Sequence, residues 1–208
     1  MTKAKVATST IGMIFECGPQ GADKQVCEYL AKHIRPEIEI KSVTLDNKDN
    51  LLRDAGKAAQ RLFSEGCSTV LVIWDLRPAW PDKKKKPCRH DERETVLKRM
   101  TEAGIDVEAS LVVPICIEQE LESWLIANEN AVSAVLSTAA HPYTAKKVKS
   151  PDNVAQPKAA MINHFSERGW RYDDKVDAIR VLRAADIDLK RLRRSVSFAR
   201  FETKLLAS

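Results

Sequence analysis

Residues 70–75, Val-Leu-Val-Ile-Trp-Asp, carry the clearest structural signal in this chain of 208 residues. Five consecutive apolar residues, mostly β-branched or aromatic, are typical of a strand buried on both faces of a sheet. The run stops at the carboxylate of Asp75, and Pro78 and Pro81 then force the chain into a loop. Parallel sheets bind ligands at the carboxyl ends of their strands, so we expect Asp75 to stand at such an edge.

Two other apolar runs end in the same way. Residues 11–15 run into Glu16, and residues 111–117 run into Glu118. An alternating pattern predicts a half-exposed edge strand at residues 37–43. Helical patterns between and after these strands complete a βαβαβαβα order, at residues 23–34, 47–66, 91–103 and 118–127. We therefore predict an α/β fold, with a mainly parallel β-sheet flanked by helices on both faces.

Beyond residue 130 the chain shows only helical patterns, at residues 131–139, 155–165, 174–182 and 198–206. We predict an α/β domain at residues 1–130 and a basic helical C-terminal extension at residues 131–208, packed on it. Residues 1–139 carry 19 Lys/Arg and 21 Asp/Glu, and residues 140–208 carry 15 and 8. The basic second half suggests a polyanion partner, and a solvated basic face explains it equally well.

Several classes of protein are disfavoured by what the sequence lacks. No apolar run approaches the roughly 20 residues of a membrane span, and the first residues lack the apolar segment of a signal peptide. The five cysteines are irregularly spaced, as expected for reduced thiols, and we predict a cytoplasmic protein without a membrane partner. Motifs of P-loop ATPases, dinucleotide-binding folds and α/β-hydrolases do not occur.

The acids after the three apolar runs form the first candidate site: Glu16, Asp75, Glu118, Glu120 and Glu122. Clustered carboxylates repel one another unless a cation lies between them, and Mg²⁺ or Mn²⁺ prefers such oxygen ligands. Each acid also has a simpler explanation, because strands commonly end where they meet water. If the helix predicted at residues 118–127 starts at Glu118, then Glu118 and Glu122 share one helix face and Glu120 lies on another. If it starts later, Glu118 and Glu120 belong to the loop.

The loop at residues 76–90 is the second candidate site. It contains four consecutive lysines followed closely by Arg89, and a second lysine-rich loop spans residues 141–153. Long loops in compact domains are commonly functional, and basic side chains there bind phosphates. The candidate nucleic-acid-binding residues are Lys83, Lys84, Lys85, Lys86, Arg89, Lys146 and Lys147. The simpler alternative is a solvated run of charge.

Three motifs resemble those of TOPRIM domains. They are the strand ending in Glu16 with its Gly-Pro-Gln-Gly turn and Asp23, the strand ending in Asp75, and the Glu-Leu-Glu-Ser-Trp-Leu segment at residues 120–125. The third resembles a signature of small bacterial TOPRIM-like proteins similar to the TOPRIM half of OLD-type nucleases, often encoded beside ABC-type ATPases in phage-defence loci. The resemblance covers roughly residues 10–128. It implies a Mg²⁺-dependent centre that cleaves nucleic acid, with Glu16 as acid/base and Asp75 as metal ligand.

The sequence departs from this pattern at Arg77, where the family has a second aspartate. Arginine cannot bind a cation, so Asp82, Asp91 or the Glu118, Glu120 and Glu122 group would have to supply the missing oxygen. Arg77 would instead hold the scissile phosphate, or mark a lost activity.

These observations lead to three hypotheses. The first is a Mg²⁺- or Mn²⁺-dependent TOPRIM-like nuclease of antiviral defence that acts with an ABC-type ATPase partner. A homo-oligomer is compatible with this hypothesis. The catalytic residues of the nuclease would be Glu16, Asp75 and Arg77, with Asp82 and the three glutamates as further metal ligands. The second is a non-catalytic adaptor that binds an ATPase or nucleic acid, which Arg77 favours. The third is a nucleotide-binding or phosphotransfer enzyme that uses the same acidic edge.

Overall fold

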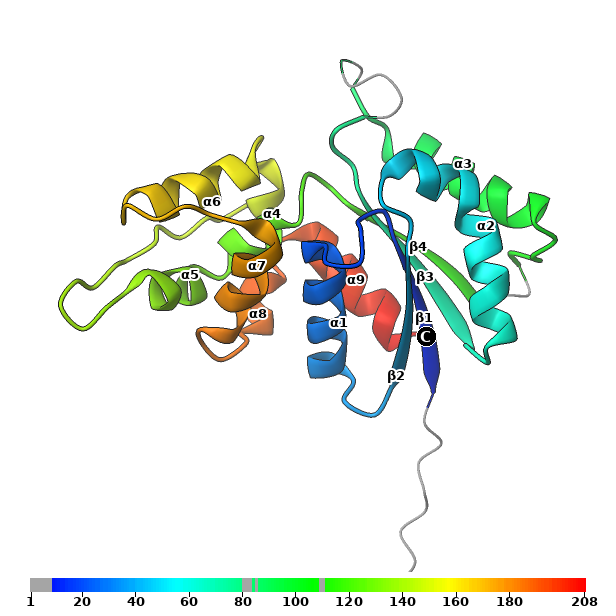
Figure 1. The fold of residues 1–208 in the computed structure, drawn as a ribbon, viewed down its shortest axis with the longest axis horizontal. Helices are drawn as coiled ribbons and strands as arrows, with labels where there is room; N and C mark the ends of the chain where they lie inside the picture. The colour runs from blue at the N-terminus through cyan, green and yellow to red at the C-terminus, as the bar shows by residue number, and fades with distance from the viewer. Residues whose placement is uncertain (1–8, 80–83, 85, 109–110) are drawn as a thin grey trace, which may run out of the picture.

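The computed structural model describes residues 9–79, 84, 86–108 and 111–208. Asp82, Lys83 and Lys85 lie outside these ranges, so their predicted roles stay predictions. The described chain folds as a parallel β-sheet with helices on both faces and a helical C-terminal region, which confirms the predicted fold class (Figure 1). Its strands are β1 (Thr10–Phe15), β2 (Glu39–Thr44), β3 (Thr69–Asp75) and β4 (Leu111–Ile117).

The strands are hydrogen-bonded in the order β2-β1-β3-β4, and every neighbouring pair is parallel. All four carboxyl ends therefore lie at one edge of the sheet. The central strand β3 is buried on both faces, as its sequence predicts. Leu71 and Ile73 belong to one apolar cluster, whereas Val70, Val72 and Trp74 belong to the other.

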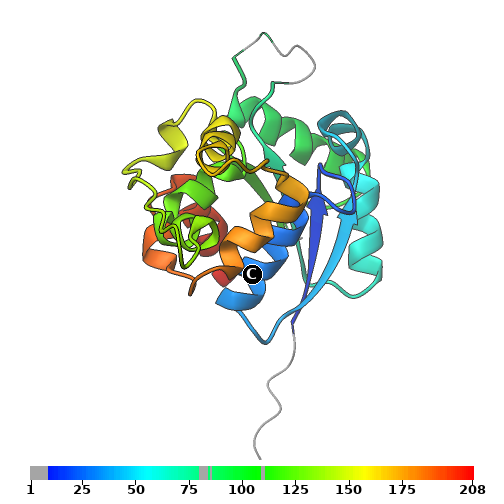
Figure 2. The same cartoon turned by 60° about the vertical axis from the view of Figure 1, so that its left-hand side comes forward.

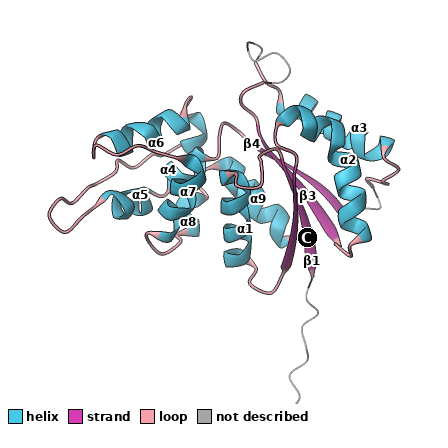
Figure 3. Cartoon of the chain, in the orientation of Figure 1, coloured by secondary structure: helices cyan, strands magenta, loops and turns pink. Residues whose placement is uncertain are grey.

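Helices cover both faces of the sheet, as Figure 3 shows. On one face lie α2 (Lys48–Ser64) and α3 (Arg89–Glu102), and on the other lie α1 (Ala22–Ile34) and α9 (Val196–Leu206). The side chain of Asn47 caps α2 by accepting a hydrogen bond from the backbone N–H of Asn50. Helix α9 is the last element of the chain, yet it packs against the edge strand β4.

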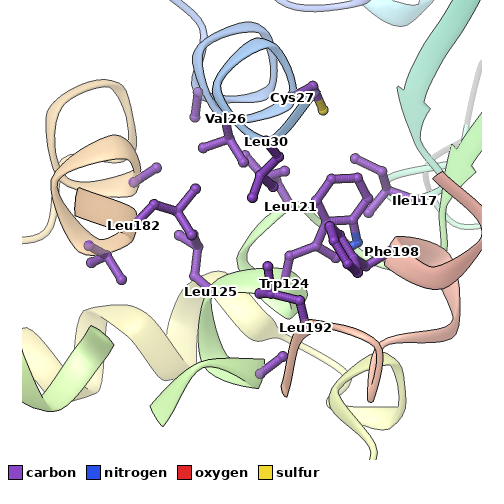
Figure 4. Close-up of a cluster of buried hydrophobic side chains, with 14 of the residues drawn as sticks. Val26, Cys27, Leu30, Ile117, Leu121, Trp124, Leu125, Leu182, Leu192 and Phe198 are labelled. Carbon is purple, nitrogen blue, oxygen red and sulfur yellow. The ribbon is translucent and has the colours of Figure 1, made fainter. Parts of the chain in front are cut away.

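The remaining helices form a layer beyond α1 and α9 (Figures 1 and 2). They are α4 (Glu122–Ala127), α5 (Glu129–Leu136), the 3₁₀ turn η1 (Pro151–Asn153), α6 (Pro157–Ser166), α7 (Asp174–Arg183) and α8 (Leu189–Leu192). Figure 4 shows the buried cluster that joins this layer to the sheet, in which Trp124 lies beside Phe198. Both sides of residue 130 thus contribute to one core, and a domain division there stays a prediction.

The structure corrects two predicted helices. The helix after β4 begins at Glu122 rather than Glu118, and the next helix spans Glu129–Leu136 rather than residues 131–139. Asn128 separates them, and its side chain accepts a hydrogen bond from the backbone N–H of Ala131. The short elements η1 and α8 were not predicted, because three or four residues show no periodicity. None of the helices in the described ranges combines the length and apolar character needed to cross a bilayer.

Candidate functional site

The structure brings Glu16 and Asp75 together at the carboxyl edge of the sheet. Glu16 directly follows β1 and Asp75 ends β3, and these two strands are neighbours. The backbone N–H of Asp75 donates a hydrogen bond to Oε1 of Glu16 at 3.1 Å. The other carboxylate oxygen of Glu16, Oε2, and Oδ1 of Asp75 are buried and have no hydrogen-bond partner among the described residues.

A cavity of about 500 Å³ opens at Asp75. Six acidic and two basic side chains line it: Asp23, Asp46, Asp75, Glu120, Glu122, Asp174, Lys158 and Lys175. We call it the acidic cavity. Glu16 is outside this lining and contacts it through Asp75. Acidic side chains therefore outnumber basic ones in this lining by three to one.

Burial raises the pKa of these acids, and their mutual repulsion adds to the effect. Burial raises the pKa of Glu16 to about 8 although nearby Lys48 lowers it. Burial likewise raises the pKa of Asp75 well above its usual value, with Asp23, Glu16, Glu122 and Glu120 acting in the same direction. The pKa of Asp23 rises to about 6 and that of Glu122 to about 7, again chiefly through burial. At neutral pH the cluster retains protons unless a cation replaces them.

Helices α6 and α7 form the opposite wall of the acidic cavity. The backbone N–H of Lys158 donates to Oε2 of Glu120 at 3.2 Å, and the Lys158 ammonium pairs with Asp174. The hydroxyl of Tyr172 donates to Oε1 of Glu122 at 3.2 Å. The site is therefore built jointly by the sheet and the helical C-terminal region.

Residues 118–122 separate the acidic cavity from a second one. Glu118 and Gln119 line a neighbouring cavity of about 530 Å³, whereas Glu120 and Glu122 line the acidic one. Glu118 thus does not join the other acids. Its Oε1 accepts hydrogen bonds from Arg89 at 2.8 Å and Arg200 at 2.6 Å.

The basic candidates lie apart from the acids. The exposed side chain of Arg77 lines the second cavity with Lys86 and Arg89, not the acidic one. Lys84 is exposed in the loop before α3. Lys146 and Lys147 are exposed between α5 and η1 and line neither cavity. Asp91 is exposed on α3, also outside the lining of both cavities.

The carboxylate oxygens of the acidic cavity suit a hard divalent cation, and Asp75, which lines the cavity, has an oxygen without a hydrogen-bond partner among the described residues. As the side chains stand, no three His, Cys, Asp or Glu residues of the described ranges already converge on one metal position. Binding through few carboxylates and several water molecules, the usual mode of Mg²⁺, needs no such preformed cage.

A family model matches residues 20–206 and is described as "Domain of unknown function (DUF4276)". The chain belongs to the DUF4276 family. Neither the comparison with curated proteins nor that with solved structures gives a match. The matched range contains Asp75, Glu120, Glu122 and Lys158, and it begins after Glu16. The resemblance to TOPRIM domains stays a prediction.

Five charged residues that line the acidic cavity of this DUF4276 chain were absent from the predicted site: Asp23, Asp46, Lys158, Asp174 and Lys175. Asp23 follows the Gly-Pro-Gln-Gly turn at the start of α1, and that turn was the available signal. Asp46 has a φ of 66°, a left-handed conformation that local sequence does not reveal. Lys158 and Asp174 reach the cavity only through the packing of α6 and α7, which no local pattern encodes.

Proposed function

We propose that this protein is a Mg²⁺- or Mn²⁺-dependent nuclease that hydrolyses phosphodiester bonds at the acidic cavity. The observation that carries the proposal is the buried pair Glu16 and Asp75, each with a carboxylate oxygen that lacks a partner. Burying unpaired carboxylates is costly, so their retention at the ligand-binding edge of a parallel sheet favours a cationic ligand. The ATPase partner and the role in antiviral defence rest on the resemblance of residues 120–125 alone.

The roles of the side chains follow from their positions. Glu120 and Glu122 with Asp75 would hold the cation, which when bound stabilises charge on the transferred phosphoryl group. Glu16, with a pKa of about 8, holds a proton at neutral pH, and because it lies outside the cavity lining it would donate this proton to a leaving oxygen through a bridging water. Lys158 is half-buried at the wall, where its ammonium would face a phosphate oxygen.

Two substitutions test this proposal. Glu16→Gln and Asp75→Asn keep the shape of each side chain but remove its ability to ionise and to exchange a proton. We expect each to lower nuclease activity by about a hundredfold or more, and Asp75→Asn to weaken Mg²⁺ binding measured by calorimetry by about tenfold. Glu94→Gln on the exposed surface of α3 is the matched control and should change neither quantity. Full activity in both cavity variants would refute the proposal.

The adaptor hypothesis is favoured by Arg77, whose side chain is exposed at the second cavity and supplies no oxygen to the acidic one. An adaptor has no reason to bind Mg²⁺ or Mn²⁺ at the strand ends. Absence of calorimetric binding for both ions would therefore select the adaptor. Hydrolysis of free nucleotides without cleavage of polymers would select the phosphotransfer enzyme instead.

A further inference from the structure

Four basic side chains converge beside the edge strand β4. Arg89 and Arg93 are four residues apart on α3, and Arg200 and Lys204 are four residues apart on α9. Each pair therefore shares one helix face. The two helices flank β4 from opposite faces of the sheet, and the four side chains line a cavity of about 290 Å³ together with Pro114 and Cys116. We call it the edge-strand pocket.

The positive charge of this pocket is poorly compensated. Glu118 is the carboxylate that pairs with Arg89 and Arg200, and both guanidinium groups bind its same oxygen. Arg93 forms no ion pair with the described residues, and the Lys204 ammonium donates to the neutral carbonyl of Pro114. Burial lowers the pKa of Lys204, and Arg93, Arg200 and Arg89 lower it further. Four cations thus face one carboxylate in a partly desolvated space.

The pocket continues toward the acidic cavity. Arg89 and His90 line both the edge-strand pocket and the second cavity, which adds Arg77 and Lys86. The segment 118–122 then separates the second cavity from the acidic one. Basic side chains therefore extend from the side of β4 to the second cavity, which residues 118–122 separate from the proposed reaction site.

We propose that the edge-strand pocket binds a phosphate group of the nucleic-acid backbone through Arg89, Arg93, Arg200 and Lys204. The planar guanidinium group of arginine can donate two parallel hydrogen bonds to phosphate oxygens, and an anion would relieve the repulsion among the four cations. The volume suits one phosphate with its sugar rather than a stacked base pair. The nucleic-acid source of the phosphate rests on the proposed function, whereas the anion site itself does not.

The test is fluorescence anisotropy with a labelled oligonucleotide in EDTA, so that binding is measured without hydrolysis. The variant is Arg93→Gln with Lys204→Gln, which leaves the Arg89–Glu118–Arg200 contacts in place. We expect affinity to fall about tenfold or more, and the slope of log K against log salt to become shallower by about 0.7–0.9 units, because one neutralised phosphate contributes that amount. The matched control is Lys57→Gln with Arg61→Gln, which removes the same charge from the exposed face of α2 and should shift affinity less than about twofold.

Competition distinguishes the source of the phosphate. Inorganic phosphate or a mononucleotide that displaces the oligonucleotide from the wild type, at constant ionic strength, would show that free phosphates also occupy the pocket. Displacement by longer oligonucleotides alone would assign it to the polymer backbone. Equal oligonucleotide binding by the Arg93/Lys204 variant and the wild type, or no binding by either, would overturn the proposal. Normal binding with no cleavage in Mg²⁺ would refute the proposed nuclease function and leave the phosphate site standing.

Discussion

At the scale of single residues, the raised pKa values of the acidic cavity predict how stability depends on pH. Glu16 ionises in the folded protein at about pH 8 and Glu122 at about pH 7, whereas both ionise near 4.5 in an unfolded chain. Between these values the folded state holds protons that the unfolded state has released. The free energy of unfolding in EDTA should therefore fall as pH rises from 5 to 8, by at most about 1.4 kcal/mol per pH unit for each retained proton.

Denaturant titrations at several pH values measure this slope. Asp75→Asn removes one carboxylate and its repulsion of Glu16, so its slope should be shallower than that of the wild type. Glu94→Gln should run parallel to the wild type, and comparison with it removes contributions from other groups such as His164. Mg²⁺ should stabilise the wild type more at pH 8 than at pH 5.5, because it competes with protons. If the free energy of unfolding of Asp75→Asn depended on pH with the same slope as that of the wild type, the acids would not be coupled as described.

At the scale of elements, the sequence predicted the strands well and the segment after β4 poorly. Apolar runs such as residues 70–75 encode buried strands directly, because five consecutive apolar residues have few other stable placements. The start of α4 was ambiguous, since the acids of residues 118–122 fit a helical first turn as well as a loop. Packing decides between them: Glu118 turns toward Arg89 and Arg200, which come from α3 and α9. No pattern within residues 118–122 records partners so distant in sequence.

The crossing of α2 and α3 depends on Gly56. A Cβ at this position would lie 2.4 Å from the backbone oxygen of Arg99 and 2.6 Å from Cβ of Ala103. Alanine normally stabilises a helix interior relative to glycine by about 1 kcal/mol. Here we expect Gly56→Ala to destabilise the protein by about 1–2 kcal/mol, because overpacking against backbone exceeds that gain. Lys57→Ala, on the exposed side of the same helix, should change the urea midpoint little, and a stabilised Gly56→Ala variant would contradict this close packing.

At the scale of the whole molecule, charge follows tertiary structure rather than the halves of the chain. The acidic cavity combines Asp23 and Asp75 from the sheet region with Asp174 from α7. The edge-strand pocket combines Arg89 and Arg93 with residues of the last helix, α9. The sequence shows the excess of basic residues after position 139. It does not show that these residues lie on separate surfaces, because that depends on the return of α9 to β4.

The same path makes the C-terminal helix part of the central core, which predicts that the chain unfolds as one unit. Phe201 is fully buried, its ring lies 5.3 Å from that of Trp124, and both belong to the cluster that contains the sheet residues Leu71 and Ile73. We expect Phe201→Ala to lower the free energy of unfolding by about 3–5 kcal/mol. Leu206→Ala on the same helix is the control, because Leu206 is 58% exposed and should cost less than about 1 kcal/mol.

A single core should also make different probes report the same transition. Tryptophan fluorescence monitors the indoles, including the buried Trp74 and Trp124. Far-ultraviolet circular dichroism monitors the helices, both those that cover the sheet and α4 to α8 beyond them. If residues 131–208 complete the core, both signals should change at one urea concentration in the wild type, and both midpoints should shift together in Phe201→Ala. Two separated transitions, of which Phe201→Ala shifts only one, would mean that the C-terminal region unfolds independently. In that case the wall formed by Lys158 and Asp174 would open without loss of the sheet, and the acidic cavity would be a site between two folding units.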